Sequence, residues 1–402
     1  MRMLSKQSGQ ILPFAVLGLT IACAVLLLMY NSGQKITDKT VVANAADATA
    51  YSAGIWTSRH LNFMAYTNRA MIANHVGTGH LVSYVAWMRY VHDSTRKLSK
   101  VAGWFPYIGP ALQAANNLAE RIKTISENGA KFAIPAIEQL NNVYFASQVE
   151  AQYGLTYFKI NRIMEETAKV YDPNIKINQI SDMSDLPLPV RSVITARIAA
   201  QRIKIPAFVE TFSPGTDDKG ELSALVERSY GPSQRWIAGN RGWSDGIPFI
   251  VKFKKTGSTT HQMDDEITDW SANDRLSFAT PDWLGWDWET LAKGKATARE
   301  FDSDYRGINH YYAIREDQPS ESKGLYITVY AAKRQNQSHT ELLLPLSKED
   351  PQGEKPLNAT ATALVFFKRP DNEFGSKREE YGSLYNPFWE PKLINQNNVI
   401  GF

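Results

Sequence analysis

The sequence predicts an α+β protein, in which an N-terminal transmembrane helix continues into a helical domain and an antiparallel β-rich domain follows. Two observations predict it. No charged residue occurs between Lys6 and Lys35, and after Pro206 the apolar residues change from a period of about 3.6 to a period of 2. We therefore expect three regions: a short cytoplasmic leader and membrane anchor in 1–34, a helical stalk and domain in 35–205, and a β-rich domain in 206–402.

The anchor is expected at Ile11–Tyr30, because twenty helical residues span roughly 30 Å, the hydrocarbon thickness of a bilayer. A cleaved secretory signal fits less well, since the first small-x-small sites, beginning at Ala43, lie more than ten residues past Tyr30. The residues expected to face lipid are Ile11, Leu12, Pro13, Phe14, Leu17, Leu19, Ile21, Val25, Leu26, Leu27 and Leu28.

Charge and cysteine usage predict the orientation of the chain. Arg2 and Lys6 precede the anchor, and Lys35 and Lys39 follow it, so the positive-inside bias is slight. Cys23, the only cysteine, lies inside the anchor, and a body without thiols suits an oxidising compartment. We expect a single-pass protein of a bacterial inner membrane with its C-terminal region in the periplasm.

Composition excludes some partners. The chain has 44 basic and 41 acidic residues and a net charge of +3, which gives no reason to expect nucleic acid. About 370 residues remain after the anchor, enough for two domains.

The helical region is expected to begin at Lys35–Ile55, where alanines recur at helical spacing and extend the membrane helix as a stalk. The pattern stays helical from His60 onward, and the Gly- and Pro-containing stretch 103–110 predicts a loop. Three further helices are expected at 111–126, at 136–171 with a possible break at Gly154, and at 190–204.

Four stretches predict strands of an antiparallel sheet, because apolar and polar residues alternate between turn residues. They lie at 248–254, 307–315, 324–330 and 362–367, and a short helix at 220–229 is expected to precede them.

Both ends of the chain resemble a known family. The run Ser8–Phe14 leads into the membrane helix, and the run Asn44–Tyr51 follows it. Together they resemble the N-terminal signature of the TadE/TadG-like proteins of Flp (tight-adherence) pilus assembly. The segments 59–74, 365–370 and 380–389 are similar to one subgroup. The residues that carry the resemblance are Gly9, Gln10, Asn44, Ala45, Ala46, Asp47, Asn62, Tyr66, Asn68, Arg69, Asn74, Asn386, Pro387 and Trp389.

The resemblance implies a membrane-anchored protein that takes part in pilus biogenesis or related secretion through other proteins of the machinery. Prepilins are cut after a glycine and carry glutamate at the fifth mature position, where this chain has Phe14, so the pattern of a cleaved pilin is incomplete. Some TadG-like members carry an Asp-x-Ser-x-Ser metal site, and the nearest stretch here, Asp182–Leu186, lacks the last serine.

No catalytic, cofactor or metal site is predicted. His75 and His80 are five residues apart, which is not the i, i+4 spacing of a zinc helix. The acidic run Asp264–Glu266 with Asp269 lacks the order of a calcium loop and is expected to be a solvated turn.

Four tryptophans leave a second hypothesis open. Trp270, Trp283, Trp286 and Trp288 could fill a core, or could form a binding surface for a partner or a sugar. The first hypothesis is a non-catalytic pilus-assembly protein. The alternative is a membrane-tethered carbohydrate-binding module or hydrolase that uses the segment 270–288.

Overall fold

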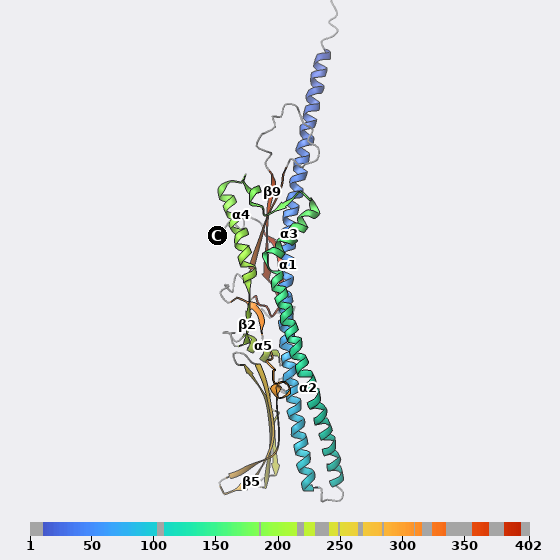
Figure 1. Ribbon diagram of the computed structural model, residues 1–402, viewed down its shortest axis with the longest axis vertical. Helices are drawn as coiled ribbons and strands as arrows, with labels where there is room; N and C mark the ends of the chain where they lie inside the picture. The colour runs from blue at the N-terminus through green and yellow to red at the C-terminus, as the bar shows by residue number, and fades with distance from the viewer. Residues whose placement is uncertain are drawn as a thin grey trace, which may run out of the picture.

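The computed structural model has the α+β fold that the sequence predicts (Figure 1). It describes residues 11–102, 108–184, 186–214, 221–229, 241–247, 250–263, 268–283, 285–308, 310–315, 324–334, 356–369 and 382–394. The protein is elongated. One long helix runs along its length, with a second helix beside it and the sheets stacked along it (Figure 1).

Helix α1 (Ile11–Ala102) continues without interruption from the expected anchor through the expected stalk. Its 92 residues correspond to about 140 Å of helix. Pro13 lies in the first turn, where a missing N–H breaks no helical hydrogen bond, and no other proline follows within the helix.

Helix α2 (Gly109–Gly154) returns antiparallel to α1, and α3 (Tyr157–Tyr171) follows it. The expected boundary between a helix at 111–126 and one at 136–171 was wrong, because the chain stays helical through Pro135. The possible break at Gly154 is confirmed, since α2 ends there. There Leu155 N–H bonds to Gln152 O, and the Trp56 indole N–H donates to Gly154 O over 2.8 Å, so the last carbonyl of α2 is satisfied by α1.

At the end of the body nearest the apolar part of α1, a four-stranded antiparallel sheet, here called the proximal sheet, covers α1. Its order is β1 (Lys176–Ile177), β8 (Gly324–Lys333), β9 (Leu357–Phe367) and β10 (Trp389–Ile394). The strands expected at 324–330 and 362–367 are confirmed within β8 and β9. Helix α4 (Leu188–Lys204), expected at 190–204, packs on β8 between the short helices η1 (Ile180–Met183) and η2 (Pro206–Phe208).

A two-stranded sheet of β2 (Val209–Phe212) and β7 (Tyr311–Ile314) comes next along α1, with α5 (Glu221–Ser229) near it. The strand expected within 307–315 is confirmed as β7 and the expected helix as α5.

The distal sheet contains β3 (Trp243–Ile247), β4 (Val251–Met263), β5 (Thr268–Asp282) and β6 (Gly285–Thr297), and α7 (Ala298–Phe301) follows it. The strand expected at 248–254 begins at Val251, after a turn in which Ile250 N–H bonds to Ile247 O. Strands β5 and β6 were not expected. Strand β5 contains Asn273, Asp274 and Pro281, residue types with low β propensity, and pairing with β4 and β6 overrides them.

Two large hydrophobic cores join the helices to the sheets. The first contains Leu61, Met64 and Ile160 from the helices and Ile327 and Val365 from the sheet, all fully buried. The second joins α1 and α2 to the distal sheet and to the turn 305–308. Each core takes residues from both sides of the boundary expected at 205/206, and that division into domains stays a prediction.

Candidate anchor and interaction surfaces

The expected anchor side chains lie on a part of α1 that nothing in the described chain covers. From Leu12 to Tyr30 every side chain is exposed or half-buried, and Phe14 is 74% exposed. Among the described residues, one helix is apolar and long enough to cross a membrane, and its most apolar window has a mean hydropathy of 2.5. The Thr20 hydroxyl donates within the helix, to Val16 O and Leu17 O, so this polar group needs no water.

Just beyond the expected anchor, small residues of α1 pack against the proximal sheet. Ala45, Ala46, Ala50 and Ala53 are buried at 0–1% exposure. A Cβ on Gly54 would lie 2.8 Å from the Cβ of Pro391 in β10. These small residues therefore let α1 approach the chain's own sheet closely. Asn44 and Asp47 on the same turns are exposed.

Asn62 joins α1 to the last strand. Its Nδ2 donates to Trp389 O, and Trp389 N donates back to Asn62 Oδ1, both over 2.9 Å. The side-chain amide thus pairs with one backbone unit as a neighbouring strand would.

Asn68 makes a second joint one to two turns further along. Its Nδ2 donates to Tyr312 O at 2.7 Å and to Leu384 O at 2.8 Å, and its Oδ1 accepts from Gln148 Nε2 of α2 at 2.6 Å. Asn74 makes the third, since its Nδ2 donates to Asn141 of α2.

Other residues that carry the resemblance lie around these joints. Arg69 and Asn386 line one groove of about 380 Å³ between α1, α5 and the segment before β10. Tyr66 is 62% exposed, and Pro387 is half-buried. Gly9 and Gln10 lie outside the described residues. The structure therefore brings the two resembling ends of the chain into direct contact at Asn62 and Asn68.

The four tryptophans do not form one surface. Trp270 is fully buried between α1 and the distal sheet, with its ring 5.2 Å from that of His75 and 4.7 Å from that of His261. Trp283 is fully exposed, Trp288 is 44% exposed, and Trp286 lies under the ammonium of Lys252 at 4.1 Å. A sugar site that uses all four is not compatible with the burial of Trp270.

His75 and His261 make a buried contact between α1 and β4. Their Nε2 atoms are 2.8 Å apart, and His75 Nδ1 lies 3.0 Å from the Tyr305 hydroxyl. Burial lowers the pKa of His75 well below its usual value and lowers the pKa of His261 to about 4, so both rings are neutral at pH 7. Within the described residues no three His, Cys, Asp or Glu side chains are grouped to hold a metal ion, and the run 264–266 lies outside them.

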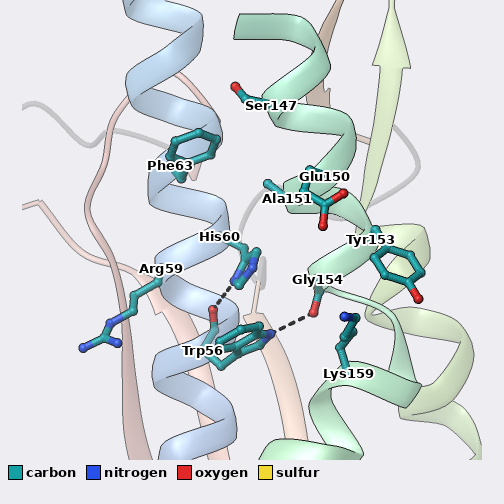
Figure 2. Close-up of a pocket in the computed structure, with 10 residues that line it drawn as sticks. All are labelled: Trp56, Arg59, His60, Phe63, Ser147, Glu150, Ala151, Tyr153, Gly154 and Lys159. Carbon is teal, nitrogen blue, oxygen red and sulfur yellow. Dashed lines mark hydrogen bonds between the residues drawn. The ribbon is translucent and has the colours of Figure 1, made fainter. Parts of the chain in front are cut away.

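A groove of about 680 Å³ opens between α1 and the junction of α2 and α3 (Figure 2). Its walls are Trp56, His60 and Phe63 of α1 facing Ala151 and Gly154 of α2. Desolvation lowers the pKa of His60, while the contact of its Nδ1 with Trp56 O at 2.7 Å opposes this shift. The polar side chains Arg59, Glu150 and Lys159 also line the groove.

Sequence reasoning missed the amides of the other helices. Gln148 of α2 accepts from Tyr312 N, and Gln201 of α4 exchanges two hydrogen bonds with the backbone of Thr328. Both are buried at 0–3% exposure. The available signal was a single amide at a buried position of an amphipathic helix, since such a group needs a partner.

Comparison with known proteins gives one match. The family model described as "Tad: Putative Flp pilus-assembly TadE/G-like" matches residues 9–56. This range covers the expected anchor and the small residues of α1 that pack against the proximal sheet. No curated protein and no solved structure matches the chain. The resemblance at the C-terminal end stays a prediction. The resemblance of the N-terminal end is confirmed: residues 9–56 match the TadE/G-like pilus-assembly family model.

Proposed function

We propose that the protein is a non-catalytic assembly protein of an Flp-type pilus or a related secretion machine. The observation that carries this proposal is the family match over residues 9–56, which coincides with the uncovered apolar part of α1. The anchor holds the chain in the bacterial inner membrane, and residues 35–402 extend into the periplasm as a stalk, a helical region and a β-rich region. There the body acts by binding other proteins of the machinery.

The rigidity of the body supports this function. Two asparagines of α1, Asn62 and Asn68, and two glutamines of other helices bond to strand backbones, and Asn74 bonds α1 to α2. A body held in this way keeps its surfaces at set heights above the membrane along a helix of about 140 Å. Such an arrangement suits a scaffold that positions partners.

Deletion of the gene in the native bacterium tests the proposal. We expect surface filaments to disappear in electron micrographs while immunoblots show that the pilin is still made. Expression of the full chain from a plasmid should restore the filaments. Normal filaments in the deletion strain would reject the proposal.

A further inference from the structure

The proximal and distal sheets are joined to the helices by side chains of different chemistry. Amides, which do not titrate, join the proximal sheet: Asn62 of α1 bonds to the backbone of β10, and Gln201 of α4 bonds to the backbone of β8. One end of the distal sheet is joined to α1 by two imidazoles, His75 of α1 and His261 of β4, which we call the histidine pair. Imidazole has the side-chain pKa nearest to neutral pH. The two sheets are therefore expected to respond differently to acid.

The histidine pair has room for one hydrogen between its rings. The Nε2 atoms of His75 and His261 are 2.8 Å apart, a distance that fits one N–H and one lone pair. His75 is fully buried, and its Nδ1 lies 3.0 Å from the Tyr305 hydroxyl. When both rings are protonated, each Nε2 carries a hydrogen and neither can accept. The doubly protonated pair therefore cannot keep this contact.

The described side chains around the histidine pair are poorly suited to balance a positive charge. They are His80 of α1, Glu138 of α2, Asp269 of β5, Arg299 of α7, and Asp302, Asp304 and Arg306 of the turn that holds Tyr305.

Burial raises the pKa of Glu138 to about 7, so Glu138 is protonated in weak acid. Asp269 already accepts the backbone N–H of Trp270 and interacts with Arg299. The acidic run 264–266, between β4 and β5, lies outside the described residues. An imidazolium in this buried site therefore loses its water without gaining the charge of Glu138.

Charged contacts elsewhere on α1 are expected to persist in weak acid. Hydrogen bonds from Arg89 lower the pKa of Glu300 below its ordinary 4.5, so this ion pair remains at pH 5. Arg89 also donates to Lys295 O, and Asp93 accepts from Lys293 N, so both residues hold the other end of the distal sheet. Acid between pH 7 and pH 5 is therefore expected to act at the histidine pair.

We propose that the histidine pair is an acid-sensitive contact, whose protonation releases the ends of β4 and β5 from α1 while the proximal sheet stays attached. The released part contains His261 and Trp270, and Arg89 and Asp93 keep the rest of the distal sheet in place. The inference does not depend on the proposed function.

The direction of the change follows from proton linkage. In the released state both rings have their ordinary pKa of 6.5, whereas burial lowers the pKa of His261 to about 4 in the packed state and also lowers that of His75. The packed state is fully favoured above pH 6.5 and less favoured as the pH falls toward 4. His261 alone gives about a twentyfold rise in the released fraction from pH 7 to pH 5.

Hydrogen–deuterium exchange of the full chain in lipid nanodiscs tests the inference. At each pH, the exchange rate of a peptide is divided into the rate of the unfolded sequence to give a protection factor. We expect protection of 259–263 and 268–272 to fall at least about tenfold from pH 7 to pH 5, and protection of β8 and β9 to change by less than about twofold. An equal loss in both sheets, or no loss in the distal sheet, would overturn the inference.

Variants assign the effect to the two rings. In the double variant His75→Gln, His261→Gln, two amides can bond to each other without titrating, so we expect equal protection at pH 7 and pH 5. His261→Gln alone, at the less buried position, should reduce the pH dependence. His310→Gln is the matched control, since His310 is exposed and its loss should leave the pH dependence unchanged. A wild-type loss of protection in either His261 variant would overturn the inference. Circular dichroism checks that each variant is folded.

Discussion

At the scale of single residues, side-chain amides join helices to strand backbones. An amide carries a donor and an acceptor at the spacing of a peptide unit, so Asn62 and Gln201 each satisfy both groups of a strand residue, Trp389 and Thr328. Buried backbone groups at a sheet edge would otherwise lose their hydrogen bonds with water. The residues that resemble the pilus-assembly subgroup at Asn62, Asn68 and Asn74 therefore have a structural explanation.

Asn62→Ala should lower the free energy of unfolding by about 1–3 kcal/mol, because Trp389 N–H and C=O both lose their partner in a part-buried place. Asn142→Ala is the matched control, since Asn142 is exposed on α2 and its loss should change stability by less than about 0.5 kcal/mol. Urea unfolding of the two variants measures the difference. Equal midpoints would show that the amide pairing contributes nothing.

Glu138 predicts a pH dependence of stability. Desolvation, with the carboxylates of Asp302 and Asp304, raises its pKa from 4.5 to about 7, and Oε2 accepts no hydrogen bond within the described part of the chain. The folded state therefore holds a proton between pH 4.5 and 7 that the unfolded state releases. This contribution to stability is complete below pH 4.5 and is lost as the pH rises through 7, by at most about 3 kcal/mol.

Glu138→Gln keeps the shape and removes the titration. We expect the difference in unfolding free energy between this variant and the wild type to grow in favour of the variant from pH 5 to pH 8. His75 and His261 titrate in the opposite sense, since neutral buried histidines lose stability as the pH falls. They are present in both proteins and cancel in the difference. A pH-independent difference would contradict the protonated Glu138.

At the scale of elements, α1 is the support on which every sheet rests, and its small residues decide how closely each sheet approaches. Gly79 illustrates this: a Cβ there would lie 2.8 Å from Cδ2 of the buried Trp270. Gly77, two residues earlier, has no atom within 4 Å of such a Cβ. The two glycines look alike in the sequence and differ only through the tertiary structure.

The pair gives a matched prediction. Gly77→Ala should raise the free energy of unfolding by about 0.5–1 kcal/mol, because alanine loses less backbone entropy than glycine in a helix. Gly79→Ala should lower it by about 1–3 kcal/mol, because the ring of Trp270 must shift in a packed core. Thermal unfolding distinguishes the two. Stabilisation by both substitutions would show that Trp270 does not pack against α1.

The difference between local sequence pattern and tertiary contact explains how much of the fold the sequence predicts. Local patterns predict α1, α4, α5 and the clean alternation of β8, since their apolar residues keep one period. They fail at Pro135, where the cost of one lost hydrogen bond does not break a long packed helix, and at β5, where Asn273, Asp274 and Pro281 are held by two neighbouring strands.

The candidate surfaces also differ in whether a local sequence pattern predicts them. The anchor is predicted because lipid exposure needs only local composition. The groove beside Trp56 depends on which side of α2 turns toward α1, and this follows from long-range pairs such as Asn74–Asn141 and Arg89–Glu127. No local pattern contains that information.

At the scale of the whole molecule, the chain is an uncovered apolar helix joined rigidly to a long body. The buried Lys333 at the end of β8 lies at the end of the body nearest the apolar helix, with its Nζ 2.9 Å from Asp38 of α1 and 2.8 Å from Asp172 at the end of α3. Moving Lys333 away from the two aspartates would leave its buried charge without a partner, which costs free energy. The stalk and the body are thereby expected to move as one unit when a partner binds.

The most direct test is to count surface filaments in the deletion strain complemented with two forms of the gene. One encodes the full chain, and the other encodes residues 36–402 behind a cleavable secretion signal, which releases the body into the periplasm. We predict that the full chain restores filaments to the wild-type number and that the released body restores none, although both accumulate to equal levels. Full restoration by the released body would contradict a function that depends on the anchor.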